Sequence, residues 1–270
     1  KGVKSVAAVL TAQREAEVQA APKAAVADPH GMEKNPKLKV NAKKIIAVAS
    51  GKGGVGKSTV AAGLARQLAA AGQRIGLLDA DIYGPSQPTL FGLKDFKPDF
   101  TDDKKIIPAE VGGVKVMSIG FMVDAEKALV WRGPMVQSAI YQMFRDVEWA
   151  DAGEPLDVLI VDMPPGTGDA QLTLAQKIDV DGAVIVSTPQ ELALADARKA
   201  VEMFGAVGVP ILGLVENMSS DVFGRGGARS EAEKLGVPFL GEIELSADIR
   251  GKADAGEEYA FPEGIISALT

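Results

Sequence analysis

The sequence of 270 residues contains no cysteine and a single histidine, His30. The first absence excludes disulfide bonds and thiolate ligands supplied by this chain. One histidine cannot build a metal site alone. Its polar, proline-containing surroundings are typical of a solvated linker residue.

Long apolar runs and an excess of basic residues are missing as well. No stretch approaches the length of a membrane-spanning helix, and no secretory signal is visible. The formal net charge of −7 argues against nucleic acid as a general partner, because a basic face would be expected. We therefore expect a cytoplasmic protein that binds neither membrane nor nucleic acid. Hydrophobic residues make up 47% of the chain, enough for a sizeable core.

The most informative stretch is a glycine-rich segment, residues 51–59, which reads GKGGVGKST. It matches the phosphate-binding pattern G-x-x-x-x-G-K-[ST]. The apolar run 43–50 before it is of strand type, and the alanine- and leucine-rich segment 60–71 after it has helical spacing. We expect the nucleotide to contact Gly51, Lys52, Gly53, Gly54, Val55, Gly56, Lys57, Ser58 and Thr59.

The residue types of this phosphate-binding loop explain the chemistry. Glycines let the backbone curl with its N–H groups toward phosphate oxygens, and the following helix presents its positive end to the same anion. Lys57 can reach the β- and γ-phosphates, and the Ser58 hydroxyl can ligate Mg²⁺. The segment therefore predicts ATP and Mg²⁺ as cofactors.

Acidic residues follow two further apolar runs of strand type. The run 74–78 leads into Asp79 and Asp81, and the run 156–161 leads into Asp162. Ligand groups of open α/β sheets gather at the carboxyl ends of the strands. We expect Asp162 to hold Mg²⁺ through Ser58 or a bound water. The alternatives are that Asp79 and Asp81 cap the next turn and that Asp162 is a plain strand-end acid.

The rest of the chain alternates between the two kinds of pattern. Further strands are expected at 114–119, 182–187, 211–215 and 237–243, and helices at 134–144, 191–204 and 230–235, with a charged loop at 94–113. Six or seven strands alternating with helices predict an α/β fold with a doubly wound, mostly parallel sheet. This domain is expected over 43–270, after a linker at 19–42 and a fragment of a small domain at 1–18.

Lys52 stands directly after the first glycine, where the loop pattern requires no lysine. The loop resembles the deviant Walker A loop of the P-loop family that contains MinD, ParA, the nitrogenase iron protein and the Mrp-type iron–sulfur carriers. In that family this lysine contacts the nucleotide phosphates of the partner subunit, so the resemblance implies an ATP-dependent homodimer. A solvated lysine is the alternative. Within the family, four other segments are similar to the Mrp-type carriers: 79–92 (DADIYGPSQPTLFG), 131–134 (WRGP), 163–169 (MPPGTGD) and 216–218 (ENM).

The resemblance also implies roles for individual residues. Asp81 would polarise the attacking water, Asp79 would lie near Mg²⁺ and its waters, and Asn217 would hydrogen-bond the adenine edge, although a turn role for Asn217 is open. Lys52, Lys57 and Asp81 form the expected catalytic set, and hydrolysis is expected to be slow. Ser58, Asp79, Asp81 and Asp162 form the expected Mg²⁺ set, directly or through water. Trp131 and Arg132 have no evident role; a packed tryptophan and an exposed arginine are the simplest interpretation.

Proteins of the Mrp type bind an iron–sulfur cluster, here expected to be 4Fe–4S, between two subunits. They transfer it to apoproteins, with assembly scaffolds as further partners. Their cluster ligands are two cysteines spaced C-x-x-C shortly after the Glu-Asn-Met segment. Here residues 216–219 run directly into 220–224 (SDVFG), so iron–sulfur ligands are absent. Either the cluster site has been lost, or this sequence lacks a segment that carries the cysteines; we favour the second, since such a loop is mobile without its cluster.

Two other functional classes stay open beside the cluster carrier. A positioning ATPase like MinD or ParA needs an amphipathic membrane helix or a basic DNA-binding face, and neither is evident. A nucleotide-gated scaffold with little turnover would bind a partner in one nucleotide state only.

Overall fold

The computed structural model describes residues 37–38, 40–122, 133–150, 153–259 and 261–267. Every described residue belongs to the unit 37–270. His30 and the expected domain fragment at 1–18 therefore lie outside the described residues, as do Trp131 and Arg132.

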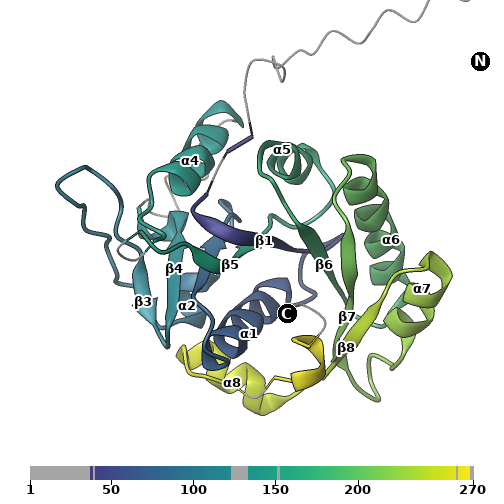
Figure 1. Ribbon diagram of the computed structural model, residues 1–270. Helices are drawn as coiled ribbons and strands as arrows, with labels where there is room; N and C mark the ends of the chain where they lie inside the picture. Colours follow the sequence, from purple (N-terminus) through teal and green to yellow (C-terminus); the bar gives the residue numbers. More distant parts are fainter. Residues whose placement is uncertain (1–36, 39, 123–132, 151–152, 260, 268–270) are drawn as a thin grey trace, which may run out of the picture. The chain divides into compact units, whose positions relative to one another are not determined.

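One sheet of eight strands forms the centre of the described part of the chain (Figure 1). The strand order is β3-β4-β2-β5-β1-β6-β7-β8, and every neighbouring pair is parallel except β3 with β4. The strands are β1 (Ala42–Ala49), β2 (Ile75–Asp79), β3 (Ala109–Val111), β4 (Val114–Ser118), β5 (Leu156–Asp162), β6 (Gly182–Ser187), β7 (Ile211–Ser219) and β8 (Phe239–Glu244).

Helices cover both faces of this sheet. Figure 1 shows α1 and α8 on one face and α4, α5 and α6 on the other. The helices are α1 (Lys57–Ala70), α2 (Gln87–Leu90), α4 (Gly133–Arg145), α5 (Asp169–Lys177), α6 (Glu191–Ala206), α7 (Gly227–Leu235) and α8 (Ala247–Ala255), with 3₁₀ turns η2 (Ile119–Phe121) and η3 (Glu263–Ile265). The predicted doubly wound α/β architecture is confirmed.

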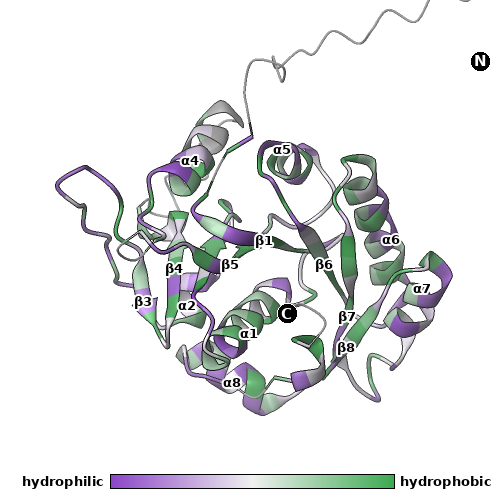
Figure 2. Ribbon diagram, viewed as in Figure 1, coloured by the Kyte–Doolittle hydropathy of each residue, from purple (hydrophilic) through white to green (hydrophobic). Residues whose placement is uncertain are grey.

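The core follows from the two covered faces. Parallel strands packed on both sides have no solvated face, so their sequences are continuous apolar runs rather than alternating ones. Every residue of β2 and of β6 is buried. Figure 2 shows the hydrophobic residues concentrated on the central strands and on the inner sides of the helices.

The structure differs from the sequence expectations in its short and peripheral elements. The antiparallel edge strand β3 lies inside the segment expected to be a loop, and three residues are too few to produce a recognisable pattern. Strand β7 continues to Ser219, so Asn217 lies within a strand and not at the start of a loop. Helices α2 and α8 were not expected, because neither has a strong apolar period.

Candidate functional site

The phosphate-binding loop connects β1 to α1 at the carboxyl edge of the sheet. Gly54 and Gly56 both have φ of +80°, a left-handed conformation that glycine adopts without steric cost. At two positions of the loop, neighbouring groups also leave no room for a side chain. A Cβ on Gly51 would lie 1.9 Å from the main-chain oxygen of Asp196, and one on Gly56 would lie 2.1 Å from Nδ2 of Asn217. The glycines are thus required by backbone conformation and by close packing.

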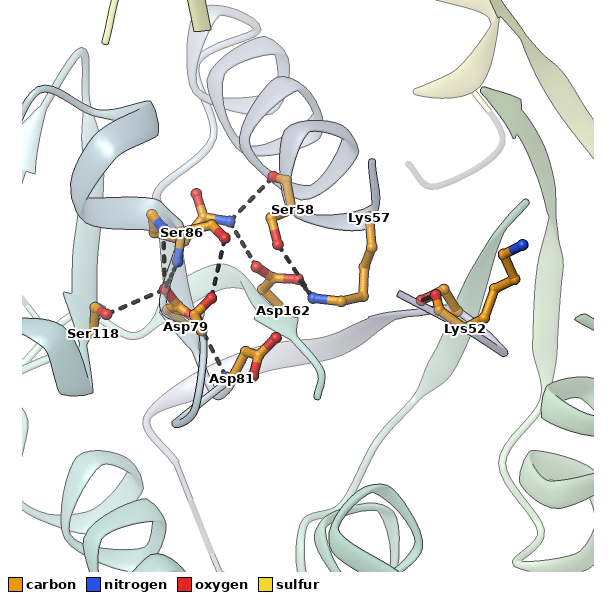
Figure 3. A network of polar contacts seen from close by, with 11 residues as sticks. Lys52, Lys57, Ser58, Asp79, Asp81, Ser86, Ser118 and Asp162 are labelled. Atoms are coloured by element: carbon orange, nitrogen blue, oxygen red, sulfur yellow. Dashed lines mark hydrogen bonds and ion pairs between the residues drawn. The ribbon is translucent and has the colours of Figure 1, made fainter. Parts of the chain in front are cut away.

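A buried ion pair lies at the first turn of α1 (Figure 3). The ammonium of Lys57 pairs with Oδ1 of Asp162, which ends β5, and donates to the Ser58 hydroxyl at 3.2 Å. Lys57 is 6% exposed and Asp162 is fully buried. A positive charge therefore lies between the two oxygen atoms that the sequence predicts as Mg²⁺ ligands, so this position already accommodates a cation.

Asp79 lies beside Asp162, because the two residues are partners in the register of β2 and β5. Its Oδ2 accepts hydrogen bonds from the backbone N–H of Ser86 (2.9 Å) and Gln87 (3.0 Å) and from the Ser118 hydroxyl (3.1 Å). Burial, together with the neighbouring Asp162 carboxylate, raises the pKa of Asp79 to about 7. The contacts correspond to the turn-capping interpretation, and Asp79 holds the segment after β2 in place.

Asp81 lines a cavity of 430 Å³ together with the phosphate-binding loop. The cavity wall also includes Lys57, Ser58 and Pro165. Partial burial raises the pKa of Asp81, and the charge of Lys57 opposes this shift. The structure thus brings the predicted acid and the predicted phosphate ligands to one cavity.

A second cavity, of 640 Å³, adjoins the first at Thr59 and Leu90. Asn217, Met218 and the segment 244–247 line it, with the inner side of α8. The Asn217 side chain is 7% exposed and donates from Nδ2 to the main-chain oxygen of Val55 at 2.8 Å. Met218 has φ of +60°, a strained conformation for a side chain of this kind. The apolar wall and the few polar groups are suited to a nucleoside base.

The Lys52 side chain does not join this site. Its main-chain oxygen accepts a hydrogen bond from the Ser50 hydroxyl at 2.8 Å. Figure 3 shows its ammonium directed away from Lys57 and the acidic residues. Among the other predicted residues, Lys57, Ser58, Asp79, Asp81 and Asp162 converge at one place, whereas Asn217 lines the adjoining cavity.

The sequence does not single out two buried polar residues beside the site. Gln87, at the start of α2, is fully buried and donates from Nε2 to Oδ2 of Asp162 (2.8 Å) and to the main-chain oxygen of Ser58 (3.1 Å). Glu216 is also fully buried and accepts from the Ser219 hydroxyl and from the N–H groups of Gly226 and Ala228, each at 2.7 Å. Only their polarity within apolar surroundings would have indicated them.

The connection after β7, where the resemblance places cluster ligands, is a closed turn. Ser220 and Gly224 exchange two backbone hydrogen bonds, of 3.1 and 2.8 Å, and the N–H of Phe223 donates to the Ser220 hydroxyl at 3.1 Å. Within the described ranges, no group of three or more histidine, cysteine, aspartate or glutamate residues is arranged to hold a metal ion. Of the helices that the structure describes, none is long and apolar enough to cross a membrane.

Comparisons with known proteins agree with this geometry. The family model described as "ParA: NUBPL iron-transfer P-loop NTPase" matches residues 41–266. An "Iron-sulfur cluster carrier protein" of Pseudomonas fragi is 51% identical over 234 residues, covering 83% of this chain and 80% of the relative. An "Iron-sulfur protein required for NADH dehydrogenase, mitochondrial" of Arabidopsis thaliana is 53% identical over 225 residues, covering 79% and 70%.

Solved structures show the same fold. A nucleotide-binding protein from Archaeoglobus fulgidus in complex with ADP is 40% identical, with a TM-score of 0.69, covering 80% of this chain and 87% of that one. The cell division ATPase MinD of Pyrococcus furiosus has a TM-score of 0.64 and covers 84% and 95%, but at 24% identity its likeness concerns the fold alone. With its phosphate-binding loop, its sheet and its close relatives, this chain belongs to the NUBPL-type iron-transfer family of P-loop NTPases.

Proposed function

We propose that this chain is a Mg²⁺-dependent ATPase that drives the transfer of iron–sulfur clusters to apoproteins. The observation that carries the nucleotide chemistry is the contact of Lys57 with both Asp162 and Ser58 beside the phosphate-binding loop. Relatives named as iron–sulfur cluster carriers, at 50–51% identity, support the cluster as the group that is transferred.

The residues at this point fit a magnesium ion. Mg²⁺ prefers oxygen ligands, and Ser58 and Asp162 supply a hydroxyl and a carboxylate within reach of one cation. When bound, Mg²⁺ offsets the charge of the phosphate oxygens. The Lys57 ammonium would exchange Asp162 for the β- and γ-phosphates, which frees the carboxylate for the metal.

Hydrolysis then depends on orientation and charge. Asp81, in the same cavity as Lys57, would orient a water for in-line attack on the γ-phosphate. Asp79 would hold the segment that carries Asp81, because it accepts the N–H groups of this segment. We propose that Asn217 contacts the base in the adjoining cavity.

Lys52 would act on the nucleotide of a second subunit, since its ammonium is directed away from Asp79, Asp81 and Asp162 of its own chain. This proposal makes the working unit a homodimer. We keep the cytoplasm as the proposed location. The relative from Arabidopsis, named as mitochondrial, supplies the alternative, and cell fractionation distinguishes the two.

The cluster ligands need a source, because the chain contains no cysteine. We propose that they belong to a segment between Met218 and Phe223 that this sequence lacks. A second candidate is favoured by the closed turn at 220–224: a nucleotide-gated scaffold that binds partners but no cluster of its own. Intact mass and peptide mapping of the protein from its natural source separate the two. A mass above 28.1 kDa with a C-x-x-C peptide supports the carrier, and a matching mass supports the scaffold.

Asp81→Ala tests the ATPase part. We expect hydrolysis to fall by about two to three orders of magnitude while ATP binding survives, because a water-orienting group acts mainly in the transition state. Hydrolysis at the unchanged rate would overturn the assignment of Asp81. Transfer of clusters by this variant at the wild-type rate would overturn the claim that hydrolysis drives delivery.

A further inference from the structure

The side chain of Gln87 contacts both sides of the candidate magnesium position. Its Nε2 donates to Oδ2 of Asp162 at 2.8 Å and to the main-chain oxygen of Ser58 at 3.1 Å. Its own backbone N–H donates to Oδ2 of Asp79 at 3.0 Å. One fully buried residue thus links the start of α1 with the ends of β5 and β2.

The two oxygens of Asp162 have different partners. Lys57 pairs with Oδ1, and Gln87 donates to Oδ2. Lys57 has to leave Oδ1 to reach the phosphates of a bound nucleotide. Gln87 is anchored at the first position of α2 by its backbone bond to Asp79, and its amide also donates to the main-chain oxygen of Ser58, a contact that does not involve Lys57. When Lys57 moves from Asp162 to the phosphates, Oδ1 of Asp162 becomes available to a metal, while Oδ2 keeps its hydrogen bond from Gln87.

We propose that Gln87 is a positioning residue that fixes the carboxylate of Asp162 for Mg²⁺. The proposal rests on the proposed ATPase function and extends it, because the phosphate-binding pattern does not include this glutamine. A neutral amide orients a carboxylate without cancelling its charge, whereas a lysine or arginine would compete with the metal. The buried Oε1 of Gln87 has no hydrogen-bond partner among the described residues, so it can accept from a water ligand of the metal.

The variant Gln87→Met tests this, because methionine keeps the length of the side chain and removes both polar atoms. Its affinity for a fluorescent ADP analogue is measured with saturating Mg²⁺ and with EDTA. We expect wild-type affinity in EDTA and binding weaker by on the order of tenfold with Mg²⁺, the usual effect of losing a hydrogen bond to a charged group. A merely structural role would weaken binding under both conditions.

Gln67→Met is the matched control. Gln67 also donates from Nε2 to a main-chain oxygen, that of Phe261 at 2.5 Å, and its Oε1 also has no partner within the described residues. It lies in α1 outside both cavities. We expect this variant to keep the full effect of Mg²⁺ on ADP affinity.

An undiminished Mg²⁺ effect in Gln87→Met would overturn the role of Gln87. Failure of the wild type to bind the nucleotide would instead overturn the proposed function. If Gln87→Met does not fold, a crystal structure of the wild type with Mg²⁺ and ADP decides. Nε2 of Gln87 within hydrogen-bond distance of Asp162 supports the proposal, and an amide turned away from the carboxylate contradicts it.

Discussion

The amide of Asn217 occupies the space that a side chain at position 56 would need. A Cβ on Gly56 would lie 2.1 Å from Nδ2 of Asn217, and this same nitrogen donates to the main-chain oxygen of Val55. Strand β7 is thereby joined to the phosphate-binding loop, although the two are 162 positions apart in the sequence. A change at Gly56 must therefore disturb both cavities together.

Gly56→Ala should weaken nucleotide binding and destabilise the fold. The positive φ of +80° alone costs an alanine about 1–2 kcal/mol. The clash with Asn217 moves the loop as well, so we expect ADP affinity to fall by tenfold or more, roughly 1.4 kcal/mol. Isothermal titration and thermal unfolding measure the two effects.

Gly72→Ala separates the effect of the positive φ from the effect of the clash with Asn217. Gly72 has a φ of +83°, and a Cβ there would meet no atom within 4 Å. This variant should lose a similar amount of stability and bind ADP as the wild type does. Equal nucleotide affinity in the two variants would contradict the role assigned to the Gly56–Asn217 contact.

Removing one partner of the buried pair of Lys57 and Asp162 should destabilise the protein strongly. Each single change, Lys57→Met or Asp162→Asn, leaves a buried group without its partner, which typically costs about 3–5 kcal/mol. The double variant leaves no isolated charge and should recover part of this loss. Urea unfolding of all four proteins gives the coupling energy. A double variant whose loss equals the sum of the single losses would contradict direct pairing.

The main features of the fold could be predicted because burial on both faces leaves a clear pattern. Segments 156–161 and 182–187 are apolar except for Asp157 and Ser187, and they form β5 and β6 almost as expected. The roles of Gln87 and Glu216 could not be predicted. Each depends on which atoms from distant segments surround a single side chain, and no local pattern encodes that.

Asp157 should make the free energy of unfolding depend on pH in the acid range. Hydrogen bonds donated by Arg74 and Lys43 hold the pKa of its carboxyl well below the usual range. In acid the unfolded chain therefore binds more protons than the folded one, and unfolding free energy rises with pH. The contribution is fully present above the ordinary aspartate pKa of about 3.9 and is lost as pH falls below it.

Asp157→Asn should remove this contribution. The difference in urea midpoint between wild type and variant is expected to be largest at neutral pH and to shrink in acid. Asp179→Asn is the control, because the pair of Asp179 with Lys37 is far more exposed and should contribute little. A constant difference across the pH range would show that the carboxyl charge of Asp157 is not the cause.

Glu216 should hold the turn after β7 closed. Its carboxylate accepts the N–H groups of Gly226 and Ala228, so Glu216→Ala leaves two backbone donors without their partner and costs about 1–3 kcal/mol for each that stays buried. We expect the segment 220–226 to open and chymotrypsin to cleave after Phe223 faster than in the wild type. Glu244→Ala removes only an exposed partner of Arg225 and should leave cleavage unchanged. Equal cleavage rates in the two variants would mean that the backbone bonds between Ser220 and Gly224 hold the turn closed without the carboxylate of Glu216.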